Sequence, residues 1–132
     1  MKKTNLIIIL ILSITLYVYI IVTKNNEVKN LFLNGRYSYG LIINIEAMKG
    51  GLVYYYTFKL DNETYKGDMR SGRLKKIGDK CFVIFEVNNY KNNKMLLKLP
   101  LVHDSIKNIP KGGWVKLPIE NIEKTDILDA MN

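Results

Sequence analysis

The feature that most constrains this chain is a run of 17 residues, LIIILILSITLYVYIIV, in which only Ser13 and Thr15 are polar. No charge lies between Lys3 and Lys24. As a helix the run extends roughly 25 Å, and with its flanks it approaches the hydrocarbon thickness of about 30 Å. It is apolar all round, unlike a core helix with a polar face. It predicts a membrane-spanning helix of Leu6, Ile7, Ile8, Ile9, Leu10, Ile11, Leu12, Ser13, Ile14, Thr15, Leu16, Tyr17, Val18, Tyr19, Ile20, Ile21 and Val22.

A cleaved secretory signal peptide is the alternative, because Lys2 and Lys3 form a positive start. Signal peptides typically have an apolar region of about 7–15 residues that ends at a small-residue cleavage site. The present run is longer, the following IIVTKNNEV has no pair of small residues, and no lipoprotein-type cysteine follows. We therefore expect an uncleaved signal-anchor, with Tyr17 and Tyr19 toward its distal interface.

The charges around this run bear on which side of the membrane the rest of the chain occupies. Two lysines precede the run, and Lys24, Lys29 and Arg36 follow it, a count that leans slightly toward a cytoplasmic domain. A short basic start that leads directly into an apolar segment is, however, typical of an anchor that exports the following chain. The net charge of +8 does not forbid export, because domains translocate largely regardless of charge. We expect a single-pass protein of the bacterial cytoplasmic membrane, with its domain on the external or periplasmic side.

The sequence after the anchor predicts one small domain. Val28, Leu31 and Phe32 share a helical face, and Asn34-Gly35 is a helix stop. The expected organisation is a transmembrane anchor at 1–24, a juxtamembrane helix or linker at 25–35, a small β-barrel domain at 36–118 and a C-terminal tail at 119–132 that can form a helix. In that tail a helix would place Ile127, Leu128 and Met131 on one side.

Strand patterns fill the chain from Tyr37 to about Val102. The first strand alternates so that Tyr39, Leu41, Ile43 and Ile45 share a face. The second, GLVYYYTFKL, points Tyr54 and Tyr56 inward with Leu52, Phe58 and Leu60, and leaves Tyr55 as the outward aromatic. YKGDMR predicts a third strand. KCFVIFEV is apolar on both faces and predicts a central strand, NNYKNN a loop, and KMLLKLPLV a fifth strand or extended segment.

These patterns predict a mainly β protein, with the N-terminal transmembrane helix followed by a small five-strand antiparallel SH3/OB-like barrel. The expected core cluster is Leu41, Ile43, Tyr54, Tyr56, Phe58, Val83 and Phe85. Trp114, the single tryptophan, would cap the open end of the barrel or lie at the bilayer surface.

No constellation of chemical groups emerges from the spacing. His103 is the only histidine, which excludes a multi-histidine metal site within one chain, and Asp104 beside it would point the other way in an extended segment. Cys81 is the only cysteine, so no internal disulfide forms, and its apolar neighbours predict a buried thiol. We expect no catalytic, cofactor-binding or metal residues, no cofactor, and no enzyme activity.

A basic cluster stands out within Lys66–Lys80, which holds six lysines and arginines and two aspartates. It predicts a solvated loop or one attracted to anionic headgroups. A basic barrel also invites a nucleic-acid interpretation, but Tyr55 alone is no stacking platform and the chain has an anchor. We therefore expect no nucleic-acid partner, and the sequence identifies no small-molecule substrate.

Three segments carry a resemblance: NGRYSYGLIINI, YYYTFKLDNETYKG and IGDKCFVIFEVNNYKNNKMLL, all after an N-terminal span. Together they resemble small, uncharacterised single-span membrane proteins of Bacteroidota-type bacteria, over roughly residues 30–102. The chain departs from that pattern at Asn89-Tyr90, where such proteins tend to carry Asn-Pro. The resemblance implies a membrane-tethered small β-barrel and no known activity.

Two functions fit these expectations. The first is a membrane-tethered, non-enzymatic β-barrel interaction module of the bacterial cell envelope, with the lipid bilayer and a protein as its partners. The alternative is an immunity-type protein that binds a toxin at the membrane.

Overall fold

The computed structural model describes residues 3–132, so Lys2 of the expected basic start lies outside the described residues. The chain divides into two compact units, one that extends to Asn30 and one formed by Leu31–Asn132. Helix α1 (Lys3–Asn34) is continuous, as expected for an anchor helix that continues to Asn34. Its end is marked by the N–H of Gly35, which donates to the carbonyl oxygen of Leu31 at 2.9 Å.

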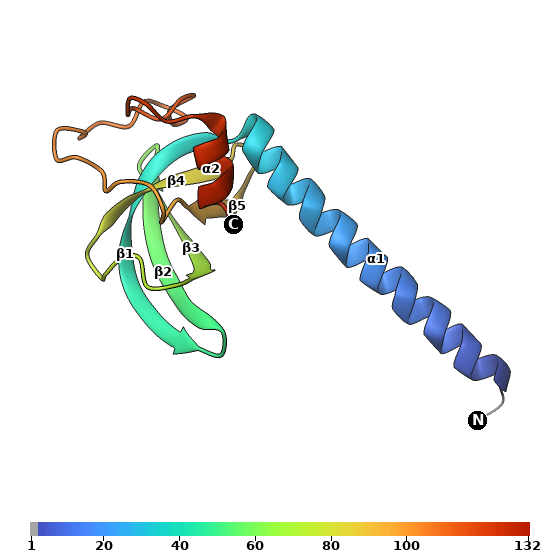
Figure 1. The fold of residues 1–132 in the computed structure, drawn as a ribbon. Helices are drawn as coiled ribbons and strands as arrows, with labels where there is room; N and C mark the ends of the chain where they lie inside the picture. Colours follow the sequence, from blue (N-terminus) through green and yellow to red (C-terminus); the bar gives the residue numbers. More distant parts are fainter. Residues whose placement is uncertain (1–2) are drawn as a thin grey trace. The chain divides into compact units, whose positions relative to one another are not determined.

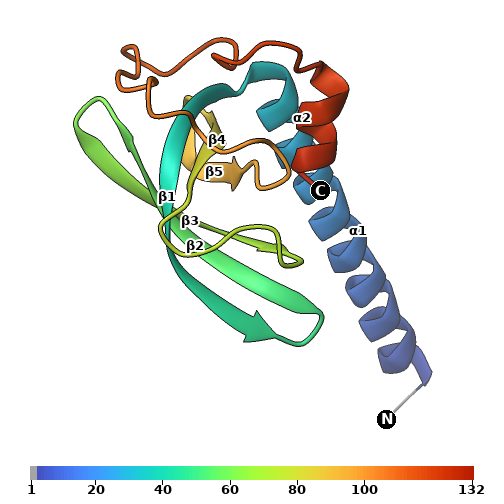
Figure 2. The same ribbon diagram turned by 60° about the vertical axis from the view of Figure 1, so that its left-hand side comes forward.

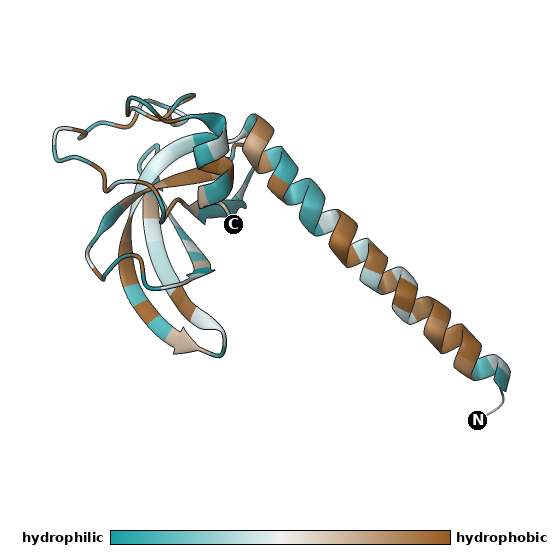
Figure 3. Ribbon diagram, in the orientation of Figure 1, coloured by the Kyte–Doolittle hydropathy of each residue, from teal (hydrophilic) through white to brown (hydrophobic). Residues whose placement is uncertain are grey.

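The apolar segment of α1 is exposed along its whole length. The large apolar side chains of the 6–22 segment are 41–67% exposed, and they form the brown stretch in Figure 3. The hydroxyls of Ser13 and Thr15 donate to the carbonyl oxygens of Leu10 and Ile11, each at 2.8 Å. Both polar side chains are thus satisfied within the helix, as a hydrocarbon environment requires. Within residues 3–132, α1 is the one helix long and apolar enough to cross a membrane.

Five antiparallel strands form the second unit in the order β3-β2-β1-β4-β5 (Figure 1). They are β1 (Arg36–Met48), β2 (Gly51–Leu60), β3 (Glu63–Ser71), β4 (Lys80–Glu86) and β5 (Asn89–Met95). The first three are linked in succession, and β4 returns to lie beside β1, which is the Greek-key arrangement. The expected small five-stranded antiparallel barrel is therefore confirmed, and its order is that of the OB-like alternative, a partly open Greek-key barrel.

The two outer strands, β3 and β5, lie close to each other and nearly close the barrel (Figure 2). The rings of Tyr65 on β3 and Tyr90 on β5 lie 4.7 Å apart. The hydroxyl of Tyr56 donates to Oδ1 of Asn93 at 2.6 Å. Gly67 is required at this seam, because a Cβ there would clash with Asn93 and with the Tyr56 ring.

A β-bulge in β1 changes which of its residues face the core. Ile42 pairs with Tyr56 and Asn44 with Tyr55, so Ile43 is an extra residue in the ladder. Ile42 is fully buried, whereas Leu41 and Ile43 are 39% and 47% exposed. The prediction that Leu41 and Ile43 belong to the core is therefore wrong. One inserted residue reverses the facing of a strand, so the expected alternation holds only after the bulge, where Ile45 packs against the core.

The remaining predicted core residues are confirmed. Tyr54, Tyr56, Phe58, Val83 and Phe85 are at most 1% exposed. They form the inner core, the cluster inside the barrel, together with Ile42, Leu60, Met69, Cys81, Met95 and Leu97. The expected interior strand is also confirmed, because β4 lies between β1 and β5 and is buried on both faces.

The fifth strand differs from its prediction. The segment expected to be a loop, Asn88–Asn93, supplies most of β5, and the strand ends at Met95. A tight turn at Val87 and Asn88 connects it to β4. Asn89 pairs with Glu86 and Asn93 with Phe85, and the register shift between these pairs leaves residues 90–92 outside the ladder. The side-chain amide of Asn93 is satisfied locally, since its Nδ2 donates to the carbonyl oxygen of Tyr90 at 2.7 Å.

The segment that follows β5 covers the outer face of β1 and β4. We use the name outer layer for this segment together with the residues of β1 and β4 that it buries. Trp114 exchanges backbone hydrogen bonds with Tyr37 at 2.8 and 2.9 Å, and its ring lies 6.5 Å from that of Phe82. Trp114 thus packs on the side of the barrel. The expected tail helix is present as α2 (Lys124–Ala130), which is drawn in red in Figure 1. It buries Ile127, Ala130 and Met131, whereas Leu128, expected on the same side, is 39% exposed.

Candidate ligand-binding groove on the outer face of the barrel

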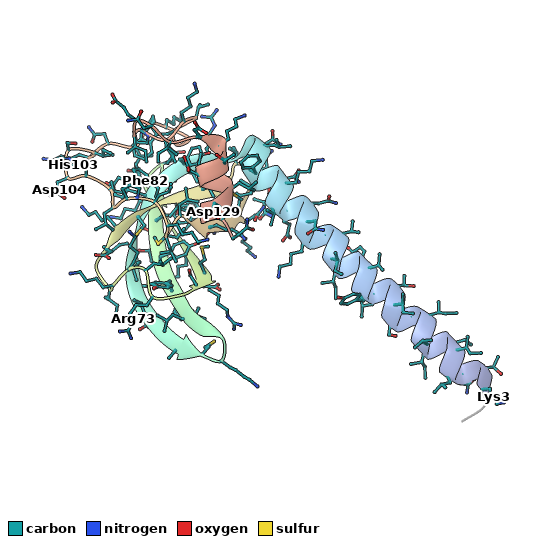
Figure 4. The ribbon with its side chains drawn as sticks, viewed as in Figure 1. Lys3, Arg73, Phe82, His103, Asp104 and Asp129 are labelled. Atoms are coloured by element: carbon teal, nitrogen blue, oxygen red, sulfur yellow. The ribbon has the colours of Figure 1, made fainter. Side chains whose placement is uncertain are left out.

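The residues that first suggested chemistry do not form a reactive site. His103 and Asp104 lie on an exposed loop (Figure 4). Nδ1 of His103 lies 2.8 Å from the hydroxyl of Ser105 and accepts the N–H of Ser105 at 3.1 Å, which is a local turn. Cys81 is in the inner core, where burial raises the pKa of its thiol to about 11. Among residues 3–132, no three of the His, Cys, Asp and Glu side chains are grouped to hold a metal ion.

A hollow of about 290 Å³ lies on the outer face of β1 and β2. Tyr39, Lys59, Lys80 and Ile109 line it, and backbone near Gly40 contributes to its surface. Nζ of Lys80 stands 6.0 Å from the centre of the Tyr39 ring, within the range of a cation–π interaction. Tyr39 faces outward because it precedes the bulge, where the even-numbered residues of β1 point to the core.

A strap, residues 103–113, forms one wall of the hollow and is fixed at both ends. Before it, the N–H of Val102 donates to the carbonyl oxygen of Lys80 at 3.0 Å, and after it Trp114 pairs with Tyr37. Between these points the hydroxyl of Tyr39 donates to the carbonyl oxygen of Lys107 at 3.3 Å. The N–H of Gly112 donates to Oδ1 of Asp61 at 3.1 Å.

A second hollow of about 520 Å³ shares Tyr39, Lys59 and Ile109 with the first. The two hollows are therefore adjacent, and we call them together the groove. Across its lining are four lysines and one carboxylate, that of Asp61: the lysines are Lys59, Lys80, Lys107 and Lys111. Within the described part of the chain, none of these lysines forms an ion pair. The groove is thus suited to anionic groups attached to an apolar or aromatic body.

Sequence reasoning missed this groove because its residues come from three strands and the strap. Tyr39 was assigned to the inward face with Leu41, and Lys80 to the basic cluster. Tyr55 is partly exposed, as expected, with its hydroxyl 3.3 Å from Oε2 of Glu46, but Tyr39 is a second outward aromatic. One signal was available: glycine within a strand often marks a bulge or a close backbone approach. A Cβ at Gly40 would lie 2.6 Å from the carbonyl oxygen of Thr57.

Comparisons with known proteins assign no relative: no family model, no curated protein and no solved structure matches this chain. The resemblance to single-span Bacteroidota-type proteins therefore stays a prediction. The chain is shown to consist of a long apolar N-terminal helix followed by a small, nearly closed antiparallel barrel.

Proposed function

We propose that this protein is a non-enzymatic interaction module, tethered to the bacterial cytoplasmic membrane by α1, whose barrel binds a partner protein. The observation that carries the proposal is the groove, in which lysines without ion-pair partners among the described residues surround Tyr39. Such a lining favours a partner segment that carries both acidic and apolar side chains. Complementary charge would speed its association and select against basic partners.

The preorganisation of the groove supports a binding role. Ser38 is fully buried, and its hydroxyl donates to the carbonyl oxygen of Lys59 at 2.9 Å, which fixes the end of β2 beside β1. The strap is held by backbone hydrogen bonds at both ends. A rigid site loses less conformational freedom when a ligand binds, so more of the interaction energy becomes affinity.

The test is recovery of crosslinked partners from membranes that contain the full chain. We expect a reproducible partner that is lost with Lys59→Glu/Lys80→Glu and kept with Lys91→Glu/Lys116→Glu, which reverses two exposed lysines outside the groove lining. Equal recovery with both double variants would contradict the role of the groove, and the absence of a reproducible partner would contradict the module itself. A partner that kills cells unless this protein is co-expressed would identify the immunity-type alternative.

The proposed location places the barrel on the external or periplasmic side. The support is the short basic start followed directly by the apolar run, as in a signal-anchor. Two C-terminal reporter fusions test it, one active only after export and the other only in the cytoplasm. A strong cytoplasmic signal with a silent exported reporter would reverse the orientation.

A further inference from the structure

The loop between β3 and β4, residues 72–79, exposes two large aliphatic side chains. Leu74 is 44% exposed and Ile77 is 58% exposed. The end of the β1–β2 hairpin lies beside this loop, since a hollow is lined by Ala47 and Leu52 from the hairpin and by Ile77 from the loop. Met48, at the hairpin end, is also 44% exposed. Large aliphatic side chains gathered at one end of a domain indicate an interaction surface rather than scattered exposure.

Hydrogen bonds to the barrel hold the loop in this position. The hydroxyl of Tyr54, whose ring is in the inner core, donates to the carbonyl oxygen of Gly72 at 2.8 Å and accepts the N–H of Leu74 at 3.0 Å. The N–H of Gly78 donates to the carbonyl oxygen of Ile42 at 2.9 Å. The N–H of Ile42 in turn donates to the carbonyl oxygen of Asp79 at 3.1 Å. The exposure of Leu74 and Ile77 is therefore a property of the folded barrel.

Four exposed cations lie near these aliphatic side chains. Arg73 and Lys76 line the same hollow as Ile77, and Lys49 follows Met48 in the chain. The fourth is Arg70. Figure 4 shows Arg73 on the outer side of the loop. Nη2 of Arg70 lies 3.9 Å from the sulfur of Met48, which joins the hairpin end to the basic residues. None of these cations forms an ion pair within residues 3–132. The carboxylate of Asp79 instead accepts the backbone N–H of Lys76 at 2.9 Å.

We propose that this basic–apolar surface, made of Met48, Leu74 and Ile77 with Lys49, Arg70, Arg73 and Lys76, binds the surface of an anionic lipid bilayer. Aliphatic side chains enter the boundary between headgroups and acyl chains, while neighbouring lysines and arginines meet lipid phosphates. Charge complementarity selects the bilayer, because each cation is available to a phosphate. The surface is separate from the groove, so the inference does not depend on a protein partner binding there.

The test uses the full chain in nanodiscs of phosphatidylcholine alone or mixed with phosphatidylglycerol, with a spin label at Gly72→Cys. A Cβ at Gly72 meets no atom within 4 Å, so the label leaves Leu74 and Ile77 in place. Cys81 is fully buried with a raised pKa and stays unlabelled. We expect the label to lose accessibility to a water-soluble nickel reagent and to gain collisions with oxygen in the anionic discs only, and high salt to reverse both changes.

Matched variants separate charge from apolar contact. Arg73→Glu/Lys76→Glu should abolish the protection, whereas Lys91→Glu/Lys116→Glu, with the same change in net charge, should retain it. Leu74→Ser/Ile77→Ser should abolish the collisions with oxygen. Equal accessibility in both kinds of disc would overturn the proposal, and so would protection that survives charge reversal. Protection that requires added membrane proteins would assign the surface to a protein partner and would equally overturn it.

Discussion

Phe82 and Phe85 lie three residues apart on β4, and neither ring is accessible to solvent, yet they belong to different layers. Phe85 points into the barrel, where its ring lies 5.9 Å from that of Phe58 and 5.7 Å from that of Tyr90. Phe82 points the other way and meets Trp114. The aromatic neighbours of Phe85 are thus on β2 and β5, with Gly113 of the strap also against its ring, whereas the aromatic neighbour of Phe82 is on a segment without regular structure.

The two layers differ in how they are held. The inner core is enclosed by antiparallel ladders, while the outer layer is fixed by a few bonds, such as the Trp114–Tyr37 pair and the bond from Nζ of Lys94 to the carbonyl oxygen of Met131 at 2.9 Å. Regions with fewer such constraints open at lower free energy. We therefore expect the outer layer to unfold before the inner core. Fluorescence of Trp114 reports the outer layer, and the reactivity of Cys81 toward a thiol reagent reports the inner core.

The largest effect is expected for Phe85→Ala. Loss of this ring from a closed core should lower the free energy of unfolding by about 3–5 kcal/mol. Urea unfolding of the full chain in detergent should show the loss with both probes, because the outer layer rests on β4. Val87→Ala, at the exposed β4–β5 turn, is the matched control and should change stability by less than about 0.5 kcal/mol. A similarly small change for Phe85→Ala would show that Phe85 is not part of the core.

A smaller and more local effect is expected for Met131→Ala. Met131 is fully buried and belongs to the outer layer. Its truncation should lower the free energy of unfolding by about 2 kcal/mol, near the low end for methionine, because an irregular layer can relax into the space. The unfolding transition followed by Trp114 fluorescence should shift to a lower urea concentration, while the protection of Cys81 from the thiol reagent should change little. Leu128→Ala, on the exposed side of the same segment, should leave both unchanged. Equal shifts of the two probes would mean that the layers unfold as one unit.

The same contrast explains how much of the fold the sequence could predict. Strict alternation in β2 and the two-sided apolar run of β4 depend on local periodicity, so Tyr54, Tyr56 and Phe85 were assigned correctly. The bulge at Ile43 was not visible, because Leu41, Ile42 and Ile43 are all apolar and any register of them gives a plausible inward face. The polar residues of β5 were expected to form a loop. They form a strand because a tight turn at Val87 brings them beside β4, and apolar patterning does not detect such a turn.

The candidate sites were harder to predict than the core. The groove joins Lys59 and Lys80 across the sheet, and only the register and the strap bring them around Tyr39. The basic cluster was visible as a charge run, but its aliphatic residues Leu74 and Ile77 gain meaning only when the barrel is seen to hold them in solvent. Surface sites of this kind depend on tertiary placement, on which sequence periodicity is silent.

Tyr54→Phe tests the link between the inner core and the β3–β4 loop. The change keeps the buried ring and removes the hydroxyl that bonds to Gly72, Leu74 and, at 3.4 Å, the N–H of Lys75. We expect the free energy of unfolding to fall by about 1–2 kcal/mol. The loss is limited because the loop groups regain some hydrogen bonds from water. Amide hydrogen exchange should accelerate at residues 74 and 75 and stay slow in β4. Unchanged exchange at both amides would show that the loop is held without this hydroxyl.

The smallest effect concerns Cys81, the thiol of the inner core. Burial raises its pKa from the ordinary 9.0 to about 11, so the folded state keeps the proton at a pH where the unfolded chain releases it. This contribution to stability is complete below pH 9.0 and is lost as the pH rises toward about 11.

Cys81→Ala isolates that contribution, because the other titrating groups are common to both chains. The stability of the unsubstituted chain should fall between pH 9.0 and about 11 by on the order of 1 kcal/mol more than that of the variant. Urea unfolding followed by far-ultraviolet circular dichroism, which reports the strands around Cys81 rather than the outer layer, measures the difference across this range. Parallel pH profiles would show that Cys81 is hydrated before the outer layer unfolds. In that case the inner core would be the more open of the two layers, the reverse of the order expected from its closed ladders.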